Sequence, residues 1–119
     1  MAMITEPRWT GEHVVSEANG QRSREQGILA AGKHAAGTVL AKNADGDFVA
    51  LAPGANDATK TAAAILYAPT DASEGPVPCV VHARDCEVHD ECLAWPDGIT
   101  DAQKTTALKA LDGAGIVVR

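Results

Sequence analysis

The sequence is poor in large aromatic side chains. Its 119 residues include four of them, Trp9, Phe48, Tyr67 and Trp95. Burial free energy scales with the apolar area removed from water, so a core made mainly of Ala, Val and Leu stabilises a fold less than one with several rings. The length fits one domain with a modest core. We therefore expect self-association, which would bury further apolar surface.

The chain also lacks an excess of basic residues, a long apolar run and an even number of cysteines. Ten Lys and Arg against 16 Asp and Glu give a net charge of −6, whereas nucleic-acid binding needs a basic face, so we expect no direct contact with nucleic acid. No apolar run approaches the ~20 residues that span a bilayer. Residues 1–8 lack the apolar core of a signal peptide, so we expect a soluble protein without a membrane partner. Three cysteines do not suggest a disulfide scaffold.

Residues 1–26 are polar and show no sustained periodicity, with a turn signal at Asn19-Gly20. Their few apolar positions include Trp9 and the pair Val14-Val15. Such a segment cannot bury enough surface to offset its own ordering entropy. It is either a disordered tail or an arm that orders on a partner, with Val14-Val15 pairing with the edge of a partner's sheet. We divide the chain into an N-terminal arm, 1–26, and a compact domain, 27–119.

From Gly27 onward, short apolar runs alternate with turn clusters, a pattern typical of a small β-rich domain. Residues 37–41 and 48–51 predict a hairpin around the turn 43–46. Further strands are expected at 77–82 and 116–118, with an extended stretch over 86–95. Residues 62–67 have the Ala content of a helix, but Pro69 and the flanking turns favour a strand. Thr100-Asp101-Ala102-Gln103 has the capping-box pattern that begins a helix, which Gly113 is expected to end.

Five potential zinc ligands fall within fourteen residues, namely Cys79, His82, Cys86, His89 and Cys92. No Cys-x-x-Cys pair is among them, and along a strand Cys79 and His82 point to opposite faces. His82, Cys86 and Cys92 could still converge if the chain folds back. We favour buried cysteines acting as small hydrophobic residues, with the histidines toward solvent. A small metal-binding module remains the alternative function.

No combination of residues in the sequence predicts catalysis. There is no Gly-x-Ser-x-Gly elbow, and Ser16, Ser23 and Ser73 all lie in polar arm or loop contexts. No nucleophile can be matched with a base. We therefore expect a non-catalytic protein that needs no cofactor.

Seven segments in order resemble the head decoration proteins of tailed bacteriophages, the family that includes the decoration protein of phage lambda. They are Ser16–Glu25, Ala36–Leu40, Phe48–Leu51, Ala62–Leu66, Leu93–Pro96, Asp101–Leu111 and Gly115–Arg119. The resemblance implies a compact α+β fold with much irregular chain, and the residue pattern makes it β-rich with one helix in the C-terminal half. It implies a homotrimer on the outer surface of the expanded capsid, which stabilises the shell against the pressure of packaged DNA.

The resemblance also implies a partner and a docking segment. The partner is the major capsid protein, met on the virion after synthesis in the cytoplasm of the bacterial host. The arm would order on the shell, and its candidate capsid-binding residues are Glu12, His13, Val14, Val15, Ser16, Glu17, Arg22 and Arg24. Three arms per trimer would make attachment multivalent. The cysteine and histidine cluster is not explained by the resemblance.

Overall fold

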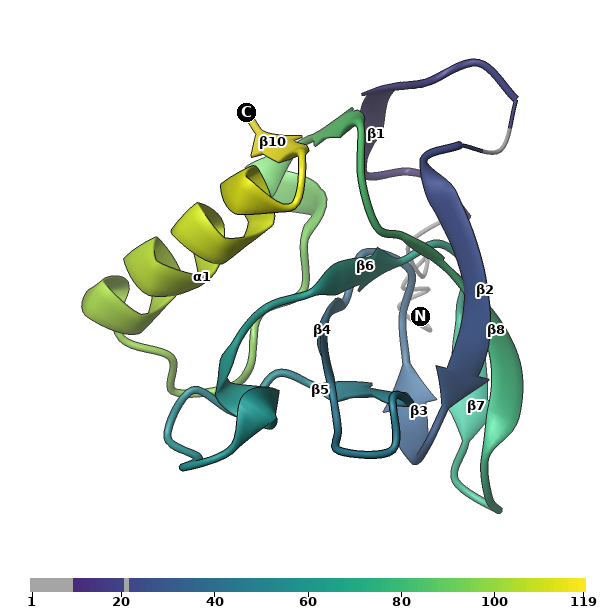
Figure 1. The fold of residues 1–119 in the computed structure, drawn as a ribbon, viewed down its shortest axis with the longest axis vertical. Helices are drawn as coiled ribbons and strands as arrows, with labels where there is room; N and C mark the ends of the chain where they lie inside the picture. The colour runs from purple at the N-terminus through teal and green to yellow at the C-terminus, as the bar shows by residue number, and fades with distance from the viewer. Residues whose placement is uncertain (1–9, 21) are drawn as a thin grey trace, which may run out of the picture.

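The computed structural model of the protein describes residues 10–20 and 22–119, and it consists of a β-rich body with one helix on its flank (Figure 1). Three kinds of element occur in the described residues: α-helix, 3-10 helix (η) and strand. In chain order they are β1 (Val14–Glu17), β2 (Arg24–Leu29), β3 (Gly32–His34), β4 (Val39–Lys42), β5 (Phe48–Ala50), η1 (Ala58–Lys60), β6 (Ala64–Leu66), β7 (Thr70–Ala72), β8 (Val77–His82), β9 (Cys86–Val88), η2 (Asp90–Cys92), α1 (Asp101–Gly113) and β10 (Ile116–Val118).

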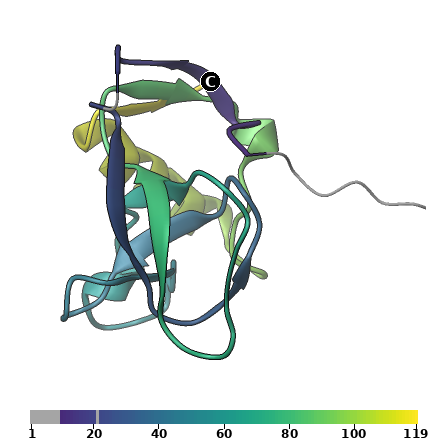
Figure 2. The ribbon, with the colours of Figure 1, turned by 90° about the vertical axis from the view of Figure 1, so that its right-hand side faces the viewer.

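Five strands close a small barrel in the order β2-β5-β4-β6-β8. The longest strand pairing in the barrel is the antiparallel one between β2 and β8. Its register runs from Arg24 opposite His82 to Leu29 opposite Val77. Figure 2 shows these two strands side by side. The ring of Phe48 packs against Gly27, in the middle of β2. The contact is so close that a Cβ added at Gly27 would lie 2.5 Å from a ring carbon. The barrel interior is filled by Leu29, Leu40, Phe48, Ala64, Leu66, Ala72, Cys79 and Val81.

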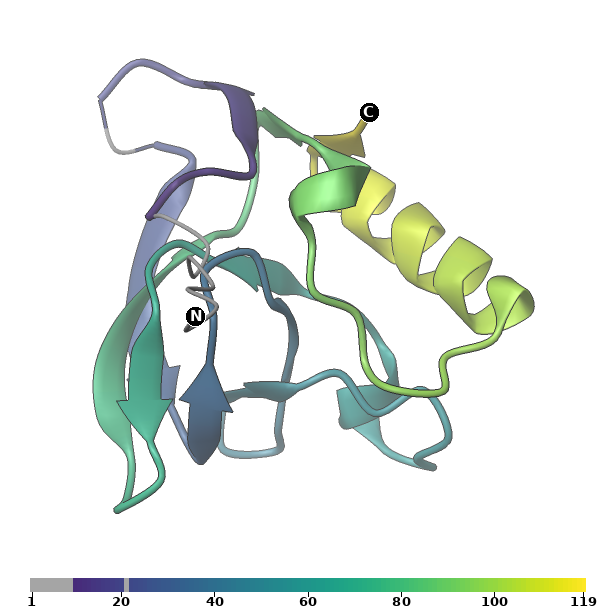
Figure 3. The ribbon, with the colours of Figure 1, turned by 180° about the vertical axis from the view of Figure 1, so that it is seen from behind.

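A three-stranded sheet in the order β1-β9-β10 lies beside the barrel. β1 pairs with β9 in antiparallel fashion, and β10 pairs with β9 in parallel fashion. A second core lies between this sheet, α1 and the barrel, and it includes Ile65, Val88, Leu111 and Ile116. Seen from behind in Figure 3, the two-stranded sheet of β3 and β7 lies on the side of the barrel away from α1.

The fold class predicted from the sequence is confirmed. β4 and β5 form the predicted hairpin, with Leu40 opposite Ala50, and the apolar run 62–67 contains strand β6 and no helix. α1 begins with both hydrogen bonds of the predicted capping box, between Thr100 and Gln103. These features depend on local turn and cap chemistry, which the sequence displays directly.

One local prediction is confirmed and one is wrong. The helix ends at Gly113, as predicted, and the chain turns out of α1 at Gly115, with a φ of +90°. The extended stretch predicted for 86–95 is interrupted by η2. In both places the chain keeps its backbone hydrogen-bonded, and the Gly115 N–H donates to the Asp112 carbonyl at 3.0 Å.

The predicted boundary between arm and domain falls inside β2. The three residues 24–26 pair with 80–82 of β8, within the barrel. Residues 1–9 and 21 of the predicted arm lie outside the described residues. That residues 1–26 act as a separate docking arm stays a prediction.

Gly37 lies against the backbone of Cys92, the last residue of η2. Its replacement tests how closely the barrel packs on η2. We expect Gly37→Ala to destabilise the protein by about 3 kcal/mol or more, because the backbone has a φ of +87° and an added Cβ would overlap the Cys92 carbonyl oxygen. The matched control is Gly46→Ala, where φ is +83° and no atom lies within 4 Å of the added Cβ. It should cost about 1–2 kcal/mol from backbone strain alone. Urea denaturation compares the two, and equal losses would contradict the predicted overlap.

Candidate functional site

The N-terminal part of the described chain is attached along the end of the barrel. The Gly11 N–H donates to the Tyr67 carbonyl at 2.9 Å, and β1 then runs along β9 from Val14, opposite Val88, to Glu17, opposite Cys86. An irregularity in the register falls between Val14 and Ser16. β1 is an edge strand, since β9 is its only neighbour in this sheet among the described strands.

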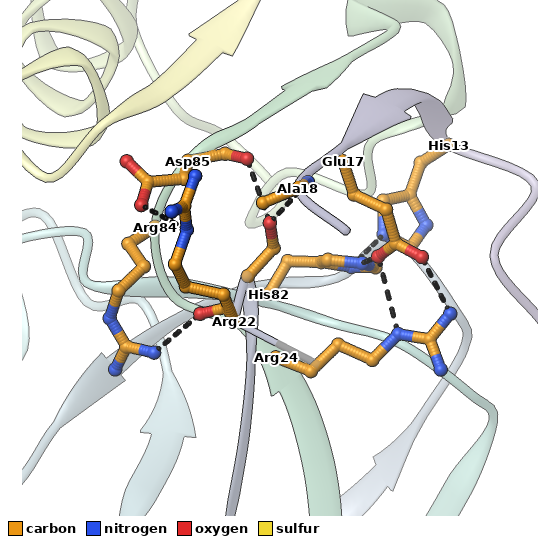
Figure 4. A network of polar contacts seen from close by, with 9 residues as sticks. His13, Glu17, Ala18, Arg22, Arg24, His82, Arg84 and Asp85 are labelled. Carbon is orange, nitrogen blue, oxygen red and sulfur yellow. Dashed lines mark hydrogen bonds and ion pairs between the residues drawn. The ribbon is translucent and has the colours of Figure 1, made fainter. Parts of the chain in front are cut away.

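A polar row, made of His13, His82, Glu17 and Arg24, connects β1 to the barrel (Figure 4). His13 and His82 are 1% and 0% exposed. The His13 Nε2 lies 3.2 Å from the His82 Nδ1, and the His82 Nε2 lies 2.7 Å from a carboxylate oxygen of Glu17. The two rings meet edge to face, with centroids 5.2 Å apart. Because unpaired polar atoms are costly in a core, these contacts fix the position of Glu17 and the turn before β1.

Glu17 also binds Arg24, the first residue of β2. The guanidinium donates to both carboxylate oxygens, at 2.7 and 3.2 Å, and it lies 4.2 Å from the centre of the Tyr67 ring. A two-pronged pair of this kind is stronger than a single ionic contact. The hydrogen bond from Arg24 is the main reason that the pKa of Glu17 is lowered, and His82 adds to the effect. Burial lowers the pKa of His82, against the opposing influence of Glu17.

A second attachment point is the side chain of Ser23, which is fully buried. Its hydroxyl accepts from the Ala18 N–H at 2.8 Å and donates to the Asp85 carbonyl at 2.7 Å. Asp85 has a left-handed backbone, with a φ of 51°, and its carboxylate lies 3.4 Å from the exposed side chain of Arg22. Ser23 thus holds the end of β1 to the β8–β9 connection.

The structure divides the eight residues predicted to bind the capsid into three groups. The side chains of Glu12, Val15, Ser16 and Arg22 are exposed, with Val15 43% exposed. His13, Glu17 and Arg24 belong to the polar row instead, and Val14 is half-buried. That any of them binds a capsid stays a prediction.

Sequence reasoning missed the roles of three residues at this site, Ser23, Tyr67 and His82. His13 and His82 are 69 positions apart, and no spacing rule connects them. The one available signal is a histidine at the end of a strand that is otherwise apolar or Pro-containing, since such a residue needs a buried partner. That signal identifies His82 but not what it contacts.

The cysteine and histidine cluster is dispersed in space. Across residues 10–20 and 22–119, no group of three or more His, Cys, Asp or Glu side chains is placed to hold a metal ion. Cys79 lies in the barrel interior and Cys86 in the core under α1. The cysteines at 79 and 86 are buried as expected, and His89 is exposed. The expectation that His82 faces solvent is wrong, because its ring is buried and part of the polar row.

Comparison with known proteins places the chain in one family. A family sequence model described as bacteriophage lambda head decoration protein D matches residues 3–116. The match covers the N-terminal segment, the barrel and α1. No curated protein matches the chain significantly. Within the described residues, no helix has the length and apolar character needed to cross a membrane.

Replacement of Ser23 tests the attachment of β1. We expect Ser23→Ala to lower the free energy of unfolding by about 1–3 kcal/mol, because the Ala18 N–H and the Asp85 carbonyl lose the hydroxyl that both contact. Ser16→Ala, on the exposed face of the same segment, is the control and should stay within about 0.5 kcal/mol of the parent protein. Chemical denaturation provides both values. A Ser23→Ala protein as stable as the control would contradict the attachment.

The three thiols should differ in reactivity. Burial raises the pKa of Cys79, and it raises that of Cys86 to about 11, so neither forms the reactive thiolate readily near pH 8. Cys92 is half-buried. We expect a thiol reagent to modify Cys92 first in the native protein and all three after denaturation, as read by mass spectrometry. Native Cys92→Ser protein should react only slowly, and rapid modification of Cys86 would contradict its burial.

Proposed function

We propose, because the chain belongs to the bacteriophage lambda head decoration protein D family, that it binds the outer surface of the expanded phage head as a trimer and stabilises the shell against the pressure of packaged DNA. Decoration of the phage capsid is the role of this family, which places the protein on the virion. The match over residues 3–116 is the observation that carries the proposal. The proposed partner is the major capsid protein, and the proposed role is structural, without catalysis.

We propose further that β1 and the residues around it dock on the capsid, with two kinds of side chain in different roles. Glu12, Val15, Ser16 and Arg22, which are exposed, would contact the shell. The inward-facing side chains of the polar row would hold the segment in place. Two features support this. β1 is an edge strand, and edge strands present backbone groups that can pair with another chain. A segment already held in an extended form loses less entropy on binding.

Self-association is supported by the small core and by one apolar side chain on the outside of the barrel. The exposed large apolar residues among those described are Val15, on β1, and Ile28, on β2. Ile28 lies beside Pro78 and Val80 of β8, on a face that a neighbouring copy would cover. Three copies bound together would each contribute a docking segment, so that modest affinity per segment adds up to firm attachment.

The two exposed apolar residues allow a crossed experiment. Val15→Glu should leave the oligomer intact but lower the affinity for expanded, DNA-free shells of the cognate capsid protein by about tenfold or more, since a carboxylate would replace an apolar contact at the interface. Ile28→Glu should convert trimers to monomers and weaken shell binding through lost multivalency. Sedimentation measures the oligomeric state, and co-sedimentation with shells measures binding.

The control for both variants is Thr106→Glu, which adds the same charge on the exposed face of α1. It should change neither the oligomeric state nor binding. Undiminished shell binding by Val15→Glu would contradict the docking role of β1. A parent protein that is monomeric would contradict the trimer, and one that does not bind shells would contradict the proposed function.

A further inference from the structure

The contact between the N-terminal segment and the barrel includes two buried imidazoles, His13 and His82, beside the carboxylate of Glu17. His13 precedes β1, Glu17 ends it, and His82 ends β8. Two further residues belong to the set: Arg24, the first residue of β2, and Tyr67, which follows β6. We propose that this set is an acid-sensitive latch, which holds β1 against the barrel at neutral pH and releases it when both imidazoles are protonated. The proposal concerns the isolated protein and does not depend on capsid binding.

The hydrogen bonds between the two rings and Glu17 fit one another when both histidines are neutral. The His82 Nε2–H donates to Glu17 at 2.7 Å, which leaves the Nδ1 of His82 as an acceptor for the Nε2–H of His13 at 3.2 Å. These tautomers are assigned from the network, since Glu17 and Arg24 permit only a donor at the His82 Nε2. Both ring nitrogens of His82 are then used.

Protonation disturbs this pattern in two steps. The first proton on His82 creates an N–H at its Nδ1, so His13 must change tautomer to accept it. A second proton, on His13, creates two facing N–H donors and places two positive charges in contact. Both side chains are at most 1% exposed. Like charges repel strongly when water does not separate them. Glu17 offsets one positive charge, but its carboxylate is already shared with Arg24.

The surroundings set the direction of the pH effect. The pKa of His82 is lowered by burial first and by the charge of Arg24 as well, while Glu17 opposes the shift. A histidine with a lowered pKa in the closed form favours that form when neutral. The stabilisation is therefore complete above the ordinary histidine pKa of 6.5 and decreases as the pH falls below it. Glu17, whose pKa is lowered from 4.5, stays ionised in this interval.

The topology allows β1 to open by itself. β1 lies at the edge of its sheet, so its release breaks the pairing with β9 and leaves β9 paired with β10. The five barrel strands do not include it. Segments held by few contacts open at lower free energy than the rest of a fold. The neutral contacts of Ser23 lie at the far end of the segment and limit how much of it is released.

Hydrogen exchange on the full-length chain at pH 7.5 and 5.5 tests the latch. After correction for the intrinsic exchange rate, the protection of amides in β1 should fall several-fold at pH 5.5 relative to amides in α1. Imidazole NMR signals should show one histidine that titrates below its usual pKa. Unchanged relative protection, together with His13 and His82 titrating independently near 6.5, would overturn the proposal.

Variants separate the latch from general acid destabilisation. His13→Gln keeps a hydrogen-bonding side chain but removes the second charge, so β1 protection should lose most of its pH dependence. Glu87→Gln is the matched control, because Glu87 pairs with Ser16 across the same two strands, outside the latch. It should keep the full pH dependence. If His13→Gln does not fold, the histidine titration of the parent protein decides. A folded His13→Gln protein with the parent's pH dependence would overturn the latch.

Discussion

The pairing of β2 with β8 is the constraint on which the rest of the structure depends. Its register places Cys79 and Val81 in the barrel interior and brings His82 opposite Arg24. A slip by one residue would reverse the two faces of β8, so that the histidine would enter the apolar core. The same register puts a cationic and an imidazole side chain within reach of one carboxylate, that of Glu17. The pairing that closes the barrel therefore also brings together the side chains that anchor β1.

Much of the domain could be predicted because its signals are local. A hairpin is specified by its turn, and the helix start by Thr100 and Gln103, three residues apart. The N-terminal segment could not be predicted in the same way. Its apolar content is too low to indicate packing, yet polar side chains such as Glu17 and Ser23 hold it to the domain. Their partners are 62 to 65 positions away, and no local pattern encodes contacts over that distance.

The cysteine and histidine cluster shows the opposite error. Five potential ligands are close in the sequence, but strand alternation and the turn at Asp85 send them to separate places. Cys79 and Cys86 fill different cores, and His82 faces the N-terminal segment. Closeness along the chain therefore indicates little about a shared site when the residues span two strands and a turn. The buried histidine is explained by a partner from the other end of the sequence.

The polar row bears on the proposal that this polar segment of the chain docks on a capsid. Within β1, Val15 faces outward while Glu17 reaches toward His82, so a few residues both hold the strand and present a surface. A strand held by charged and imidazole groups keeps these contacts only at a pH that preserves the protonation states of those groups. An apolar anchor would be indifferent to pH, but it would add exposed apolar surface whenever the strand opened. Polar anchoring keeps both forms of the segment compatible with water, which suits a protein that must exist free before it meets a shell.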